Sequence, residues 1–172
     1  MKEREKLYWT AITATIALLA CVACGKGKSK AADAAGEKAP VHEHHAPHGG
    51  TLVELGEGEF AHLELLLDPA TGTLTAYSLD GEAENPIRLK QDKISMIVRG
   101  TAGPGELTLG LSAKPNSLTG EVVGDTSEFS GNSNLLKNAS TFTGKILSVS
   151  TKGATFKDIE FAYPEGPAED KK

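Results

Sequence analysis

Hydrophobic and polar residues alternate with a period of two over most of the chain from residue 51 onward. That period places successive side chains on opposite faces of a β-strand. The clearest run is 60–67, in which one face carries Leu63, Leu65 and Leu67 and the other carries His62, Glu64 and Leu66. We expect the three aligned leucines to face the core.

Turn-forming glycine, proline and aspartate residues separate these short alternating runs. The pattern predicts strands over residues 51–55, 60–67, 73–79, 86–89, 93–99, 106–111, 117–123, 142–150 and 155–163. One short helical segment is expected within 132–138, where Ser133 can cap the first turn. Eight or nine short strands with regular turns predict an all-β fold, either an antiparallel β-sandwich or a small barrel.

The second half of this region aligns with the first without a gap. At an offset of 44 residues, the leucines of 63–67 fall on those of 107–111, and Leu74 falls on Leu118. This indicates a duplicated hairpin. The alternative is that two unrelated hairpins with equal loop lengths align equally well.

The N-terminus reads as a secretory signal, with a charged start and an apolar run over 7–20. Leu18-Leu19-Ala20-Cys21 resembles the bacterial lipobox. The resemblance implies cleavage before Cys21 and lipidation of that cysteine, and hence a membrane anchor of the palmitate type. Three alternatives stay open: cleavage before Cys24, an uncleaved anchor helix, and a Cys-x-x-Cys redox motif at 21–24.

The predicted organisation follows from this pattern and from composition. We expect a lipoprotein signal peptide over 1–20 and a lipidated cysteine with a flexible His-rich tether over 21–46. A β-sandwich domain follows over 47–163, and a disordered tail over 164–172.

Composition removes several function classes. The net charge is −5, and no Lys or Arg cluster offers an electrostatic footprint for nucleic acid. Both cysteines lie in the leader, which excludes a disulfide, a cysteine zinc site and a cysteine nucleophile from the folded part. The chain carries no nucleophile elbow, His-Glu-x-x-His motif or P-loop, so we expect no enzymatic activity.

Candidate chemistry gathers at residues 42–48, which hold four of the five histidines. Neutral imidazole binds copper, zinc or nickel, and binding weakens when the ring is protonated. The predicted metal ligands are His42, His44, His45 and His48, with His62 and Glu64 from the neighbouring strand. The alternatives are a solvated His-rich linker and, for His62 and Glu64, an ordinary solvent-facing position on a half-exposed sheet.

Three short motifs carry a family resemblance: Pro47-His48-Gly49-Gly50, His62-Leu63-Glu64-Leu65 and Leu74-Thr75-Ala76-Tyr77. Together they resemble small bacterial His-rich lipoproteins and the N-terminal segment of heavy-metal-efflux periplasmic adaptor proteins. The resemblance covers residues 47–99. The helical hairpin and lipoyl-like parts of the adaptors are missing. The resemblance implies a periplasmic module that is associated with metal homeostasis and has an envelope or efflux protein as its partner.

These observations predict an extracytoplasmic lipoprotein, anchored in the cell envelope and facing the periplasm or the exterior, that binds or buffers a transition metal. The rival prediction is a non-catalytic envelope-structural or protein-interaction lipoprotein. Because the Gly49-Gly50 pair turns the chain into the first strand, His48 is expected to lie over the sheet near His62 and Glu64. We expect His48 to be the most important histidine.

Overall fold

The computed structural model describes residues 44–100 and 105–164. The chain divides into two units, Met1–Pro40 and Val41–Lys172, and the first lies wholly outside the described residues. Within the described residues no helix is long and apolar enough to cross a membrane. The predicted signal peptide, Cys21, most of the tether and the tail after Pro164 fall outside them.

The second unit is all-β, as predicted, and every strand pair is antiparallel. Its elements are β1 (Thr51–Leu55), β2 (Ala61–Asp68), β3 (Thr73–Leu79), β4 (Lys93–Arg99), β5 (Glu106–Ala113), β6 (Glu128–Asn132), the 3-10 helix η1 (Asn134–Leu136), β7 (Phe142–Thr151) and β8 (Ala154–Tyr163).

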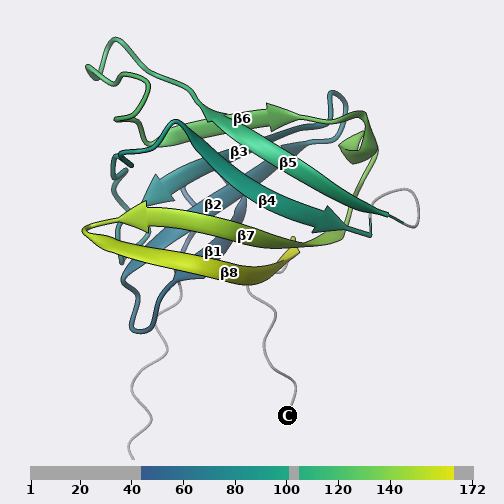
Figure 1. The fold of residues 1–172 in the computed structure, drawn as a ribbon, viewed down its shortest axis with the longest axis horizontal. Helices are drawn as coiled ribbons and strands as arrows, with labels where there is room; N and C mark the ends of the chain where they lie inside the picture. The colour runs from purple at the N-terminus through teal and green to yellow at the C-terminus, as the bar shows by residue number, and fades with distance from the viewer. Residues whose placement is uncertain (1–43, 101–104, 165–172) are drawn as a thin grey trace, which may run out of the picture. The chain divides into compact units, whose positions relative to one another are not determined.

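The eight strands form one sheet in the order β1-β2-β3-β6-β5-β4-β7-β8. The sheet rolls over, so that β4, β5 and β7 lie in front of β1, β2 and β3 (Figure 1). Between the two ends of the sheet, the Thr51 hydroxyl of β1 donates to the carbonyl of Pro164 at 2.7 Å, and the Tyr163 hydroxyl of β8 accepts from the amide of Leu67 of β2 at 3.2 Å. These contacts join the ends of the sheet into a nearly closed, barrel-like body.

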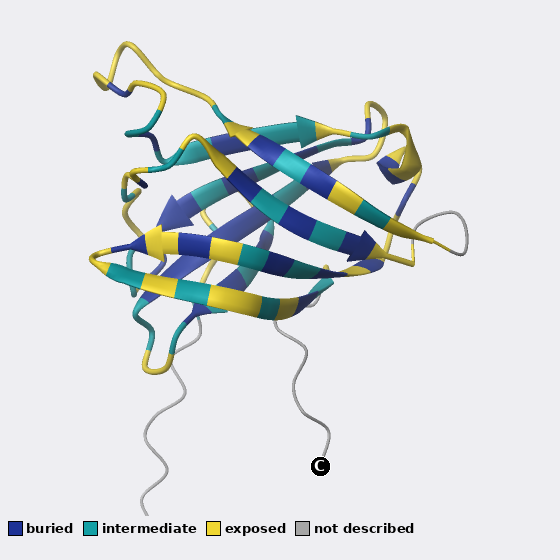
Figure 2. Cartoon of the chain, viewed as in Figure 1, coloured by how far each residue is buried: buried dark blue, intermediate teal, exposed yellow. Residues whose placement is uncertain are grey.

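The core fills the inside of this rolled sheet. Along most strands, buried positions alternate with more exposed ones (Figure 2). The three leucines of β2 that the pattern assigned to the core are buried there, and Phe129 of β6 and Phe161 of β8 contribute the largest side chains. Each such side chain contributes about 1.5–3 kcal/mol through removal of its apolar surface from water.

Three of the predicted strands match the structure residue for residue, at 51–55, 73–79 and 93–99. The helical turn is also where it was predicted, and the Ser133 side chain accepts from the amide of Leu135 at 3.2 Å. The predicted strand over 86–89 is reduced to isolated bridges that involve Pro86 and Leu89.

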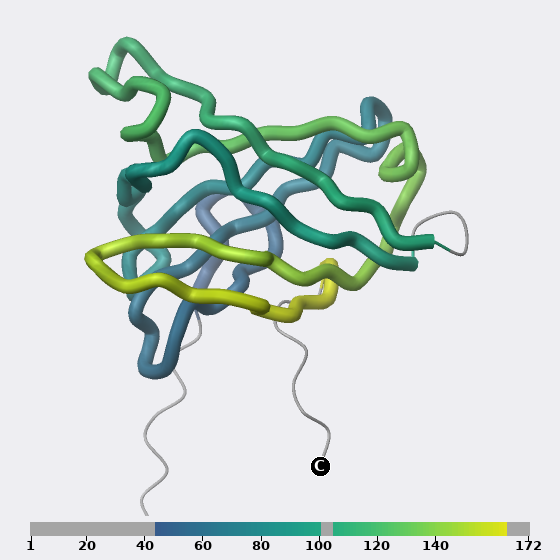
Figure 3. Tube along the Cα trace, viewed as in Figure 1, coloured from purple at the N-terminus to yellow at the C-terminus, as the bar shows by residue number. Residues whose placement is uncertain are grey.

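The predicted strand over 117–123 is wrong, and so is the duplicated hairpin. That segment belongs to a long β5–β6 loop (residues 114–127) that projects from the body (Figure 3). Leu118 in this loop is 95% exposed. The hairpin partner of β5 is β4. Strand β3 pairs with β2 and with β6, and the sequence pattern missed β6.

Candidate functional site

The last part of the His-rich stretch lies across the outer face of β2 and β3. We call residues 44–50 the strap. A tight turn in the strap is closed by the amide of Gly49, which donates to the carbonyl of Ala46 at 3.0 Å. Pro47 presets the backbone for the turn, and Gly49 adopts a φ of +74° that other residues rarely adopt.

Glu64 of β2 holds the strap to the sheet. Its carboxylate is fully buried and accepts the amides of His48 at 2.8 Å and Gly50 at 2.9 Å. Its second oxygen lies 2.7 Å from Nδ1 of His48. Gly50 must lack a side chain here, because a Cβ would lie 2.5 Å from the carbonyl oxygen of Leu65. The carboxylate therefore positions both the turn and the imidazole.

The imidazole of His48 stacks on Tyr77 of β3, with ring centroids 3.9 Å apart and an interplanar angle of 14°. Tyr77 is the register partner of Glu64 on one side and of Glu128 on the other. Burial raises the pKa of the Tyr77 phenol, and the negative charges of Glu128 and Glu64 raise it further.

A second histidine pair lies at the other end of the strap. The rings of His44 and His62 are 5.0 Å apart and tilted by 50°. Nδ1 of His44 lies 3.1 Å from the carbonyl oxygen of Glu82, and Nδ1 of His62 lies 3.2 Å from that of Asp80. Because a carbonyl oxygen only accepts, both Nδ1 atoms carry the proton. In the neutral rings Nε2 is therefore the nitrogen with a free lone pair.

Glu59, in the loop between β1 and β2, supplies a carboxylate to this pair. Its Oε1 lies 3.0 Å from Nε2 of His44. The backbone of Glu59 has a φ of +58°, and its amide donates to a carboxylate oxygen of Glu54 at 3.1 Å. Gly81 allows the facing loop to approach, since a Cβ there would lie 2.1 Å from the carbonyl oxygen of Glu59.

The electrostatics of this cluster favour a positive charge on His44. Its pKa is raised above the ordinary value, first by the hydrogen bond with Glu59 and then by the Glu82 carbonyl, against the opposing effect of burial. The supporting loop is well ordered by Asp80. The amides of Glu84 and Asn85 bond to that carboxylate at 3.0 and 3.2 Å, and these bonds help to lower its pKa, after the larger effect of the Asn85 side chain.

The structure divides the predicted ligands into two groups. His48 and Glu64 lie together, as the Gly-Gly pair indicated, whereas His62 contacts His44 instead. His45 is exposed, and His42 lies outside the described residues. The strap covers the outer face of β2, so His62 is only 4% exposed and Glu64 fully buried, contrary to the solvent-facing alternative.

Two features differ from the predicted organisation. His44, assigned to a free tether, is packed on the sheet, because its ring contacts His62 and bonds to the facing loop. Glu59, which follows Gly56 and Gly58 in the β1–β2 loop, is not among the predicted ligands. Among the described residues, no group of three or more His, Cys, Asp or Glu side chains is already arranged to hold an ion.

A scan against protein-family models found no matching model, and searches of curated proteins and of solved structures found no match either.

Proposed function

We propose that this protein is a cell-envelope lipoprotein that binds a divalent transition metal, with His44, His62 and Glu59 as its ligands. One observation carries the proposal: both histidines donate Nδ1–H to backbone carbonyls of the same loop, at Asp80 and Glu82. Metal-binding histidines almost always donate their other ring N–H in this way, because that bond fixes the tautomer and orients the ring.

The spacing of the groups supports the same conclusion. Two ligand atoms, each about 2.0–2.2 Å from a tetrahedral ion, lie roughly 3.4 Å from one another. Nε2 of His44 and Oε1 of Glu59 are 3.0 Å apart, so an ion would replace the proton that these two atoms share, and the two atoms would separate slightly. The ring of His62, whose centroid lies 5.0 Å from that of His44, is proposed as the third ligand, and its side chain would have to reorient to bind the same ion.

The donor set points to a class of metal. Two imidazoles and a carboxylate suit Zn²⁺, Cu²⁺ or Ni²⁺, and the general order of affinities places Cu²⁺ highest. His45 lies next to His44 in the sequence, and His42 two residues before it; both are proposed as loosely held further ligands. His48 and Glu64 are assigned a positioning role, since they fasten the strap that carries His44.

The proposed location in the cell envelope is inferred from the N-terminal signal segment. The apolar run before Cys21 and the lipobox-like Leu18-Leu19-Ala20-Cys21 support cleavage and lipidation at that cysteine. The anchor would hold the folded body at a membrane surface outside the cytoplasm.

One observation favours the second candidate function, a protein-interaction lipoprotein without a metal role. The β5–β6 loop exposes three apolar side chains, with exposed fractions of 95% for Leu118, 58% for Val122 and 60% for Val123. An exposed apolar group on a projecting loop is typical of a surface that contacts another molecule.

Calorimetric titration of residues 25–172 with Zn²⁺ and Cu²⁺ at neutral pH tests the proposal. We expect a dissociation constant below about 0.1 mM for the unaltered protein. In the variants His62→Gln and Glu59→Gln the affinity for the metal should fall at least tenfold. His45→Gln is the comparison variant: its ring is exposed and is proposed only as a loosely held further ligand, so we expect a smaller loss of affinity than in His62→Gln or Glu59→Gln. Binding weaker than about 0.1 mM, or binding lost in His45→Gln alone, would overturn the proposal.

A further inference from the structure

We propose that a pocket on the outer face of the sheet binds a small organic cation, an ammonium or guanidinium with an apolar body. The pocket has a volume of about 550 Å³ and lies between the strap and two loops, the β3–β4 loop (residues 80–92) and the β5–β6 loop. That volume falls within the range of small-molecule sites. The proposal is independent of the metal site, because neither Glu59, His44 nor His62 lines the pocket.

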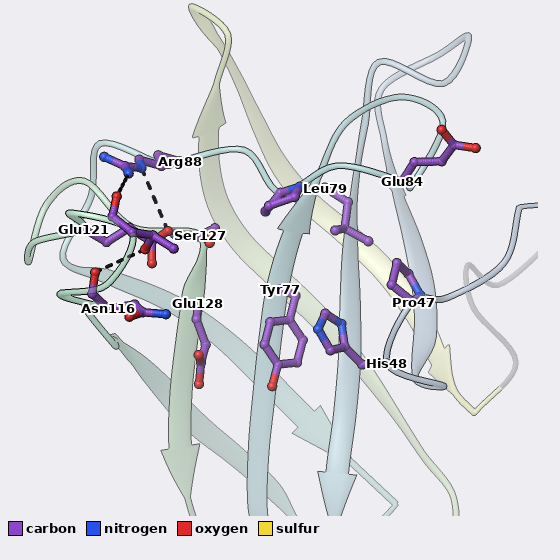
Figure 4. Close-up of a pocket in the computed structure, with 12 residues that line it drawn as sticks. Pro47, His48, Tyr77, Leu79, Glu84, Arg88, Asn116, Glu121, Ser127 and Glu128 are labelled. Atoms are coloured by element: carbon purple, nitrogen blue, oxygen red, sulfur yellow. Dashed lines mark hydrogen bonds and ion pairs between the residues drawn. The ribbon is translucent and has the colours of Figure 1, made fainter.

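Tyr77 and Glu128 are cross-strand neighbours on β3 and β6 and form the floor of the pocket. Their polar ends point in the same direction along the sheet (Figure 4). One wall carries Pro47 and His48 from the strap together with Leu79 and Pro86. The opposite wall is polar. The pocket therefore combines an apolar side with a charged one.

The aromatic part of the pocket is rigid before any ligand arrives. The imidazole of His48 is stacked on Tyr77, and Glu64 fixes that imidazole through Nδ1. Leu79, which also lines this wall, is only 1% exposed and is therefore held in place by its neighbours. A flat or apolar group can therefore be bound without the cost of ordering these side chains.

The charged part of the pocket is negative. Its only lysine or arginine among the described lining residues is Arg88, which is already paired with Asp125 at 3.4 Å, with the more distant Glu121 at 4.0 Å and with backbone carbonyls of the β5–β6 loop. Glu121 is also engaged, since its carboxylate accepts from the Ser127 hydroxyl at 2.6 Å.

The two remaining carboxylates, those of Glu84 and Glu128, form no hydrogen bond or ion pair with any described residue. Glu84 lies at the rim with its carboxylate turned outward, whereas Glu128 lies on the floor beside Tyr77 (Figure 4). The charge of Glu128 also contributes to the raised pKa of Tyr77, which agrees with their proximity.

These features select the ligand. An ammonium group placed near Glu128 gains a charge-assisted hydrogen bond and lies close to the electron-rich face or edge of Tyr77. Its apolar body then lies along the wall of Pro47, Pro86 and Leu79. An anion would meet uncompensated carboxylates and a guanidinium that is already paired, so anionic ligands are disfavoured.

Heteronuclear NMR titration of residues 25–172 with phenethylammonium tests the proposal, with 2-phenylethanol as the neutral analogue. We expect amide shifts confined to the strap, β3, β6 and the β5–β6 loop. Removing the charge in Glu128→Gln should weaken binding about tenfold, the usual worth of a charge-assisted hydrogen bond. Glu84→Gln should weaken phenethylammonium binding less than Glu128→Gln does. A second ligand, N-acetyl-lysine amide, tests whether a lysine side chain of a partner binds in the same way.

Glu57→Gln is the matched control, because it makes the same charge change at an exposed position outside the pocket. We expect it to bind phenethylammonium as the unaltered protein does. Equal binding of the neutral analogue, shifts located elsewhere, or equal weakening by Glu57→Gln and Glu128→Gln would each overturn the proposal. An absence of shifts at about 10 mM ligand, a very weak affinity, would do so too.

Discussion

Glu64 shows how one buried side chain determines the position of an entire segment. Its carboxylate is inaccessible to water, and two backbone amides and one imidazole N–H surround it. A buried carboxylate is stable only when hydrogen-bond donors surround it. Removing either the charge or its donors lowers the free energy of unfolding. The strap therefore depends on this one residue.

The variant Glu64→Gln tests this dependence. Its amide nitrogen would replace either the oxygen that accepts from the two backbone amides or the oxygen that faces Nδ1 of His48, and the buried charge is lost in both cases. We therefore expect the free energy of unfolding to fall by about 2–4 kcal/mol in urea denaturation. Glu160→Gln is the control, since Glu160 forms an exposed ion pair with Lys145 at 3.4 Å. Its effect should stay below about 0.5 kcal/mol. Equal losses in the two variants would contradict the role given to Glu64.

The pair of His44 and Glu59 makes stability depend on pH. The folded pKa of His44 is raised above its unfolded value near 6.5. The stabilisation is therefore complete below about pH 6.5 and is lost as the pH rises through the folded pKa. The difference between the urea midpoints of the unaltered protein and of His44→Gln should be largest at about pH 5.5 and should become smaller as the pH rises through the folded pKa. A difference that grows with pH would contradict this assignment.

Part of this site could be predicted from single residues. Alternation along β2 correctly placed His62 and Glu64 on one face, and the Gly-Gly pair correctly brought His48 to Glu64. The sequence could not show that the strap covers this face, because contacts between residues far apart in the chain have no local signal. Glu59 was missed for the same reason: it lies in a glycine-rich turn, where a solvated carboxylate is the ordinary expectation.

At the scale of elements, the strands that could be predicted are those with strong alternation and clear turns, such as β1, β3 and β4. β6 was missed because Phe129 is its only large apolar residue, too weak a pattern to stand out. The apolar residues of 117–123 gave a strand-like pattern instead. Leu118 is exposed, so that pattern does not arise from burial in a sheet.

The close approach of two loops holds the proposed metal site together. Gly81→Ala would place a Cβ 2.1 Å from the carbonyl oxygen of Glu59, and the β3–β4 loop must move to avoid it. We expect a loss of about 1–3 kcal/mol in urea denaturation, together with weaker Zn²⁺ binding in calorimetry. Gly105→Ala is the control, because no atom lies within 4 Å of its Cβ position. Unchanged Zn²⁺ affinity in Gly81→Ala would contradict the dependence of the site on this loop.

At the scale of the whole molecule, we propose that a lipid anchor at Cys21 attaches the folded body to a membrane. Metabolic labelling with palmitate in a bacterial host should mark the full chain, and Cys21→Ala should abolish the label and release the protein from membranes. Cys24→Ala changes the other leader cysteine and should leave both labelling and membrane attachment intact. Label that persists in Cys21→Ala would place the lipid on Cys24 instead.

The central claim is that an ion binds Nε2 of His44 and His62 while Nδ1 of each ring stays on its carbonyl. Imidazole ¹⁵N chemical shifts during Zn²⁺ titration measure this directly, because they report the state of each ring nitrogen. We predict that the Nε2 signals of His44 and His62 shift together while their Nδ1 atoms stay protonated. Shifts confined to His45 and His48, or no shift in any histidine, would contradict the account.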